Sequence, residues 1–84
     1  MRSYKLTIGS RAAKELSTLP AVVAQRIDAA ILGLSRDPPG AKKLKGARRL
    51  WRIRVGDYRI VYSIDEEQAV VDVIGVPHRS KAYR

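Results

Sequence analysis

The sequence contains no cysteine, a single histidine and only eight acidic residues among its 84. Without cysteine, neither a disulfide framework nor a thiolate metal site can supply stability. No apolar run approaches the roughly 20 residues that span a bilayer, and the first residues do not read as a signal peptide. We therefore expect one cytoplasmic domain, residues 1–84, that is near the lower size limit for folding alone and is stabilised by packing.

Further absences restrict the chemistry. The sequence shows no metal-ligand spacing, no glycine-rich loop that could cradle phosphates and no Ser/His/Asp set. His78, the lone histidine, has no second histidine with which to share an acid/base mechanism. We therefore expect no metal and no small-molecule cofactor.

Positive charge is what the sequence has in excess. Its 17 basic residues give a net charge of +9, and a run without any acid extends from Lys42 to Arg54. The basic residues of this run are Lys42, Lys43, Lys45, Arg48, Arg49, Arg52 and Arg54. Self-repulsion of this size destabilises a compact state, so a polyanionic partner is the natural inference. Nucleic acid, an acidic protein or an anionic membrane would each satisfy it, and a merely soluble basic surface is the plainer alternative.

The first 40 residues predict a strand and two helices. Near the N-terminus, three apolar residues alternate with polar ones, as in a short strand: Tyr4, Leu6 and Ile8. Ser10 is a favourable N-cap for a helix over residues 11–18. Pro20 suits the first turn of a second helix, because its missing N–H would have no partner there.

The second helix has the clearest periodicity in the sequence. Its apolar face follows a spacing of three and four residues and consists of Val23, Ile27, Ala30, Ile31 and Leu34. The segment Asp37-Pro38-Pro39-Gly40 should end it, since a residue before proline is pushed out of the helical region. We expect the two helices to form a hairpin that covers one side of a sheet.

The second half of the sequence has the period of two that is typical of strands. Residues 51–55 and 58–64 alternate around Gly56-Asp57, and glycine at the first central position suits a type II′ hairpin turn. An acidic turn over residues 65–68 leads into a last strand from Ala69 to Gly75, which Pro77 closes. The predicted fold class is α+β, with a small, largely antiparallel four-stranded sheet and an N-terminal helical hairpin packed on one face.

The hairpin turn fixes which residues face each other. The predicted pairs are Val55 with Tyr58, Arg54 with Arg59, Ile53 with Ile60, Arg52 with Val61, and Trp51 with Tyr62. The apolar members must face the helices, which leaves Arg52, Arg54 and Arg59 on the opposite face. Opposed like charges destabilise a sheet, whereas guanidinium groups match phosphate oxygens. This face therefore favours phosphate binding, and splayed arginines in water are the alternative.

The C-terminal tail can lie at the rim of the same face. It contributes His78, Arg79, Lys81, Tyr83 and Arg84. Tyr83 could stack on a base or donate its phenolic proton, although a lone tyrosine near a terminus is more often a packing anchor.

Three motifs together resemble the RelE/ParE superfamily of bacterial toxins from type II toxin–antitoxin systems. They are Leu44-Lys45-Gly46, then Trp51-Arg52-Ile53-Arg54-Val55-Gly56-Asp57-Tyr58-Arg59-Ile60-Val61-Tyr62, then His78-Arg79 with Tyr83. The resemblance covers essentially the whole chain and implies the RelE-like fold. RelE-type toxins cleave mRNA in the ribosomal A site, where the RNA 2′-hydroxyl attacks the neighbouring phosphate. ParE-type toxins poison DNA gyrase without nuclease chemistry.

The resemblance also implies site residues and partners. By position, the catalytic residues would be Arg52, Arg54, Arg59, Arg79 and Tyr83. Other basic residues are expected to bind RNA: Lys42, Lys43, Lys45, Arg48, Arg49, Lys81 and Arg84. The expected partners are a cognate antitoxin, the ribosome and mRNA, with no membrane.

Two departures from the family pattern bear on the chemistry. Arg52 and Arg54 replace paired lysines, and arginine stays protonated, so it stabilises a phosphorane but is a poor base. Pro77-His78 precedes Arg79, so a second tail arginine of some relatives is missing. The general acid and base therefore stay open between His78 and Tyr83. The leading hypothesis is a ribosome-dependent mRNA endonuclease (mRNA interferase) that inhibits translation. The alternatives are a gyrase-poisoning toxin and a basic RNA-binding module.

Overall fold

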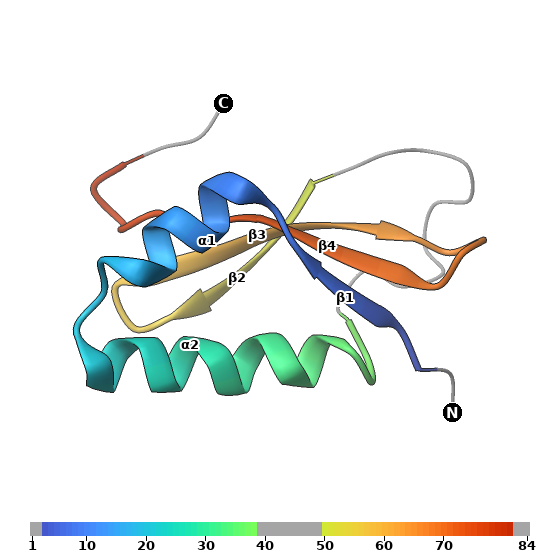
Figure 1. The fold of residues 1–84 in the computed structure, drawn as a ribbon, viewed down its shortest axis with the longest axis horizontal. Coiled ribbons are helices and arrows are strands. Elements are labelled where there is room, and N and C mark those ends of the chain that lie inside the picture. Colours follow the sequence, from blue (N-terminus) through green and yellow to red (C-terminus); the bar gives the residue numbers. More distant parts are fainter. Residues whose placement is uncertain (1–2, 39–49, 82–84) are drawn as a thin grey trace.

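Two helices and four strands make up the fold in the computed structural model, which describes residues 3–38 and 50–81 (Figure 1). In chain order they are β1 (Lys5–Ile8), α1 (Ser10–Ser17), α2 (Ala21–Leu34), β2 (Leu50–Val55), β3 (Tyr58–Asp65) and β4 (Val70–Gly75). Neither described helix is long and apolar enough to cross a membrane. The predicted strand, helix pair and C-terminal strands are all present, which confirms the α+β class.

The four strands form one sheet in the order β1-β4-β3-β2. Strand β1 runs parallel to β4, with Lys5 opposite Val70 and Ile8 opposite Val73, so the first and last strands lie side by side (Figure 1). The other two pairings are antiparallel. The sheet is therefore antiparallel except at its β1 edge, which confirms the predicted largely antiparallel sheet, whereas the parallel pairing of β1 was not predicted.

Both helices pack against the same apolar face of the sheet. The core contains Ala12 from α1, Ile27, Ile31 and Leu34 from α2, and Ile60, Tyr62, Val71 and Val73 from the sheet. The remaining predicted members of the α2 face, Val23 and Ala30, are half-buried at the margin of this core. The spacing of apolar residues along α2 and their alternation along β3 and β4 thus produce one continuous buried layer.

The helix boundaries differ from the prediction in several places. Helix α1 ends at Ser17 rather than at residue 18, and Pro20 is the N-cap residue of α2 rather than part of its first turn. Ser10 is already inside α1, and Gly9 is the N-cap residue, with no side-chain capping bond. The Gly9 N–H instead donates to the Val73 carbonyl oxygen (2.8 Å), and a Cβ on Gly9 would lie 3.2 Å from that oxygen. Close approach to β4 therefore decides where α1 begins. Helix α2 ends at Leu34, ahead of the proline segment, with Ser35 as its C-cap residue.

The turn between β3 and β4 contains a residue in the left-handed region. Ala69 has a φ of 55°, so β4 begins at Val70, one residue later than the sequence predicts. Gln68 donates its N–H to the Asp65 carboxylate (3.1 Å), which closes the turn ahead of Ala69. Alanine gives no signal for this conformation, because it rarely adopts it.

Candidate functional site

The β2–β3 hairpin has the register that the sequence predicts at every pair. Arg54 lies opposite Arg59, and Val55 lies opposite Tyr58 across the two-residue turn. In this turn only Gly56 has a positive φ (59°), as the first central residue of a type II′ turn requires. A shift by one residue would place the arginines in the core, so the apolar alternation enforces this register.

The two faces of the hairpin differ in burial and charge. Ile60 and Tyr62 are fully buried on the helix side. On the other face Arg52 and Arg54 are exposed and Arg59 is half-buried. Val61 shares the arginine face but is only 1% exposed, which the sequence does not predict. Three cationic side chains therefore share this face of the hairpin, with Arg54 and Arg59 beside the turn and Arg52 further along β2.

The chain beyond β4 continues to pair with the beginning of β3. Arg59 donates its N–H to the Pro77 carbonyl oxygen (3.0 Å), and Arg79 donates its N–H to the Asp57 carbonyl oxygen (2.7 Å). Between these two bonds His78 lies opposite Tyr58 in an antiparallel bridge. Because side chains alternate along paired strands, Arg79 lies on the same face as Arg59. The structure thus brings together Arg54, Arg59 and Arg79, from three neighbouring segments.

These three arginines, which we call the arginine cluster, have little acidic compensation. The Arg79 Nε atom is 3.8 Å from Asp57 Oδ1, and these side chains are 62% and 65% exposed. Exposed pairs of this kind contribute little to stability. No described residue forms an ion pair with Arg54 or Arg59. The cluster therefore keeps most of its positive charge available to an anion. The contact between Asp57 and Arg79 was not predicted from the sequence, because Pro77 indicates that strand pairing ends before Arg79.

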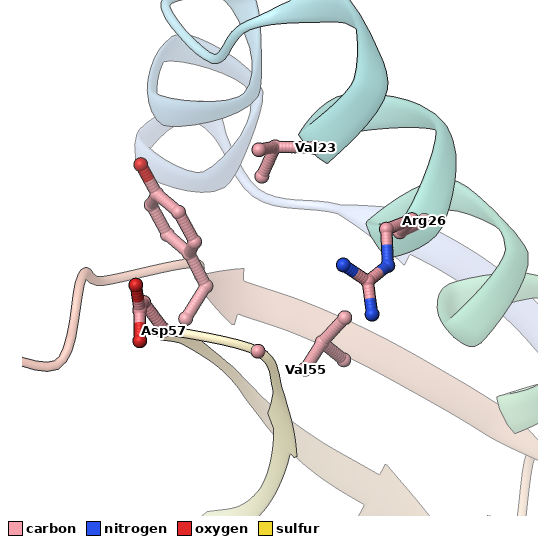
Figure 2. A pocket seen from close by; sticks show the side chains of 6 residues that line it. Val23, Arg26, Val55 and Asp57 are labelled. Atoms are coloured by element: carbon pink, nitrogen blue, oxygen red, sulfur yellow. The ribbon is translucent and has the colours of Figure 1, made fainter.

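A separate small cavity lies on the helix side of the hairpin turn (Figure 2). Its volume is about 190 Å³, and it is lined by Val23, Arg26, Val55, Gly56, Asp57 and Tyr58. Figure 2 shows Arg26 extending from α2 toward Val55. Arg26 therefore belongs to the helix side of the hairpin and does not join the arginine cluster.

Several predicted site residues lie outside the described residues. They are Lys42, Lys43, Lys45, Arg48, Arg49, Tyr83 and Arg84. Lys81 is described and exposed, and its N–H donates to the His78 carbonyl oxygen (2.9 Å). Tyr62 is buried in the core, and burial raises the pKa of its hydroxyl to about 12. Tyr62 is thus a structural tyrosine.

No group of three or more histidine, cysteine or acidic residues in 3–38 and 50–81 could hold a metal ion. What the site offers in the described segments is a set of positively charged guanidinium groups on one face of the sheet. Such groups can bind a phosphate and stabilise extra negative charge on it, but they cannot accept a proton at neutral pH.

Comparison with known proteins connects this geometry to a family. The model of "ParE toxin of type II toxin-antitoxin system, parDE" matches residues 6–83. Two toxins of Mycobacterium tuberculosis are each 32% identical to the chain: Toxin RelE, over 96% of this chain and 87% of the relative, and Toxin RelG, over 96% and 97%.

Solved structures give the same result for the fold. RelE in the archaeal RelE–RelB complex from Pyrococcus horikoshii superposes with a TM-score of 0.80 at 26% identity, covering 95% of this chain and 99% of that one. The intact RelBE toxin–antitoxin complex of E. coli gives a TM-score of 0.75 at 32% identity, covering 98% of this chain and 100% of that one. The family match, the RelE-named relatives and the shared fold all agree, so the chain belongs to the ParE/RelE family of toxins of type II toxin–antitoxin systems and is RelE-like.

Proposed function

We propose that this toxin is an mRNA endonuclease that acts on cytoplasmic ribosomes and thereby inhibits translation. The observation that carries the proposal is the Arg54–Arg59 pair, opposed across the hairpin and without an acidic partner among the described residues. Arg79 joins this pair from the segment beside β3. Three guanidinium groups from neighbouring segments on one face suit a phosphate diester, whose non-bridging oxygens accept their hydrogen bonds.

The cleavage reaction fits what arginines can do. The RNA 2′-oxygen attacks the adjacent phosphorus as it loses its proton, and the bond to the 5′-oxygen breaks as that oxygen gains one. Negative charge builds up on the phosphorane between these two events. Arg59, with Arg54 and Arg79 near it, stabilises that charge by fixed electrostatics. Arg52 lies further from the turn along β2 and binds the RNA backbone that flanks the scissile phosphate.

Proton transfer requires a group other than the arginines. Tyr83, which the family resemblance assigns to the site, is the proposed contributor from this chain. The ribosome supplies proximity by orienting the 2′-hydroxyl for in-line attack, which is worth orders of magnitude in rate. We therefore propose that cleavage of naked RNA is slow and that ribosome-bound mRNA is the substrate, with the remaining basic residues holding the RNA backbone.

A cognate antitoxin is the second proposed partner. The solved relatives named above are complexes of RelE with RelB. The net charge of +9 and the uncompensated arginine cluster suit a partner segment that is acidic or amphipathic. We propose that such a segment covers the arginine cluster and blocks access to RNA.

The test is cleavage of a defined mRNA by purified toxin, on programmed ribosomes and on the same RNA alone, with 5′ ends mapped. We expect rapid cleavage only on ribosomes, and equal rates on both substrates would refute ribosome dependence. The family model carries the ParE name, so gyrase poisoning is the second candidate. A parallel gyrase supercoiling assay decides between the two, because inhibition of supercoiling without RNA cleavage would replace the nuclease by the gyrase poison.

A further inference from the structure

His78 lies next to Arg79 in the chain, but its side chain is on the face of the sheet opposite the arginine cluster. It is half-buried and lies opposite Tyr58 in the bridge between the C-terminal segment and β3. The two rings meet edge to face, with centroids 5.1 Å apart and planes at 84°. The next residue, Arg79, lies on the other face with Arg59. His78 therefore anchors the backbone from which Arg79 extends.

The hydrogen bonds of the His78 ring indicate which of its two nitrogens is an acceptor. Ser80 donates its backbone N–H to His78 Nδ1 (3.2 Å), and the Ser80 hydroxyl oxygen is 2.9 Å from the same nitrogen. A backbone N–H can only donate, so Nδ1 must be the acceptor and the ring proton must be on Nε2. The Ser80 hydroxyl then donates to Nδ1 as well.

This arrangement caps a tight turn. The His78 side chain accepts from the N–H two residues later, as asparagine and aspartate do in an Asx turn. The His78 carbonyl oxygen accepts from the Lys81 N–H (2.9 Å), which closes the same turn on the backbone. The turn over residues 78–81 is thus held by both the backbone and the ring of its first residue.

Arg79 depends on this turn for its orientation. Its backbone N–H is fixed on Asp57 at 2.7 Å, immediately before the chain turns. The described side-chain contact of Arg79 is the exposed 3.8 Å pair with Asp57, which is too weak to fix a long side chain. The direction of the Arg79 guanidinium is therefore set mainly by the backbone on either side of it.

We infer that His78 is a positioning residue, which through its unprotonated Nδ1 fixes the 78–81 turn and so directs Arg79 toward the phosphate held by Arg54 and Arg59. The role in cleavage rests on the function proposed above, whereas the role in positioning does not. Because the lone pair of Nδ1 is occupied, this nitrogen is not the general base. The histidine acts on the reaction only through Arg79.

Three variants separate capping by Nδ1 from packing by the ring. His78→Asn places an oxygen near the position of Nδ1 and keeps the capping bond. His78→Gln places its polar group one bond further out, and His78→Ala removes it. All three lose the ring contact with Tyr58, so a purely structural role of the ring would make them equivalent.

The first measurement is independent of RNA. His78 is the only histidine, so its ring nitrogens are identified without assignment in a long-range ¹H–¹⁵N spectrum. We expect the Nε2–H tautomer, with Nδ1 unprotonated. We also expect amide hydrogen exchange at Arg79 to be slow in wild type and His78→Asn and about tenfold faster in the other two variants, while the Val73 amide is unchanged. An Nδ1–H tautomer, or equal Arg79 exchange in all three variants, would overturn the inference.

The second measurement is the single-turnover cleavage rate on saturating programmed ribosomes. We expect His78→Asn to cut within about threefold of wild type, and His78→Ala and His78→Gln to lose about tenfold or more, because small misplacement of a positioned group is costly. Wild-type rates in all three variants would also refute the inference. A wild-type toxin that cuts no RNA would instead refute the proposed function, and the Arg79 exchange pattern would still decide whether His78 positions Arg79.

Discussion

Arg54 and Arg59 lie directly opposite each other on β2 and β3, on the face of the sheet that points away from the helices. Opposed like charges cost a few tenths of a kcal/mol or more. No described residue forms an ion pair with either of them. The hydrophobic pattern of the hairpin enforces this repulsion, since a shift of the register by one residue would bury the arginines. A polyanion is the ligand that relieves it.

Replacing Arg59 should separate catalysis from stability. Arg59→Ala removes a half-buried side chain outside the core, so the melting temperature should stay within a few degrees of wild type or rise as repulsion is lost. Loss of a group that stabilises the transition state should lower single-turnover cleavage on ribosomes by roughly 10²-fold or more. The measurements are a melting curve and a cleavage rate at saturating ribosome concentration.

Arg36→Ala is the matched control for Arg59→Ala. Arg36 is exposed beyond the end of α2, so its replacement removes the same charge at a site outside the hairpin. It should weaken ribosome binding slightly and leave cleavage at saturation near wild type. Normal cleavage by Arg59→Ala, or a loss explained by unfolding, would show that this sheet face is not catalytic.

Small oxyanions should stabilise the free toxin through the arginine cluster. Ligands that bind only the folded state raise its stability by mass action, about 1.4 kcal/mol at tenfold excess over Kd, which raises Tm by several degrees in a domain of this size. Phosphate should therefore raise Tm more than chloride at equal ionic strength. The double variant Arg54→Ala/Arg59→Ala should lose most of this difference. An undiminished phosphate effect in the double variant would place the anion site elsewhere.

Two glycine-to-alanine substitutions should shift stability in opposite directions. Gly33 lies in α2, and a Cβ at this position would meet nothing within 4 Å, so Gly33→Ala should stabilise by about 0.5–1 kcal/mol through helix propensity. Gly56 has a φ of 59° in the hairpin turn, so Gly56→Ala should destabilise by about 1 kcal/mol or more. Urea denaturation measures both, and a destabilising Gly33→Ala would contradict the open environment of that position.

The buried hydroxyl of Tyr62 should make stability fall at high pH. Its pKa is about 12 in the folded chain and near 10 when unfolded, so unfolding releases a proton between these values. The contribution of the neutral Tyr62 hydroxyl to the free energy of unfolding is therefore complete below pH 10. It is lost as the pH rises from 10 through 12, at up to about 1.4 kcal/mol per pH unit.

Tyr62→Phe tests this assignment. The variant should be somewhat less stable at neutral pH, because a buried hydrogen-bonding group is removed, but its stability should fall less steeply above pH 10. Tyr58→Phe is the matched control for losing a tyrosine hydroxyl and should keep the wild-type slope. The measurement is the urea midpoint between pH 8 and 12, and parallel curves for wild type and Tyr62→Phe would disprove the burial effect.

The hairpin was the part of the fold most completely predictable from sequence. Trp51, Ile53 and Val55 alternate with arginines, and Gly56 identifies the turn, so local pattern alone sets the register. The start of α1 was not predictable in this way. Ser10 is the better capping residue by type, but the approach of Gly9 to Val73, a contact distant in sequence, decides the boundary.

The site was predictable to the extent that it depends on the hairpin. The opposition of Arg54 and Arg59 follows from the register, whereas the arrival of Arg79 beside them depends on pairing that continues beyond Pro77. Proline usually ends a strand, but here its carbonyl oxygen still accepts from Arg59. The hydrogen bond from the Ser80 N–H to the His78 ring was also not predictable from the sequence, because histidine is not the residue that usually signals such a turn.

The parallel pairing of β1 with β4 means that the sheet can be completed only late in synthesis of the chain. Strand β1 is made first and its partner β4 almost last, so the sheet cannot close until nearly the whole chain has been synthesised. Contacts that are so distant in sequence also slow the search for the native state, because a long loop must close before they form. Residues 77–79, which pair with β3, follow β4 in the chain. A nascent or truncated chain that stops before Val70 therefore lacks both the closed sheet and the arginine cluster.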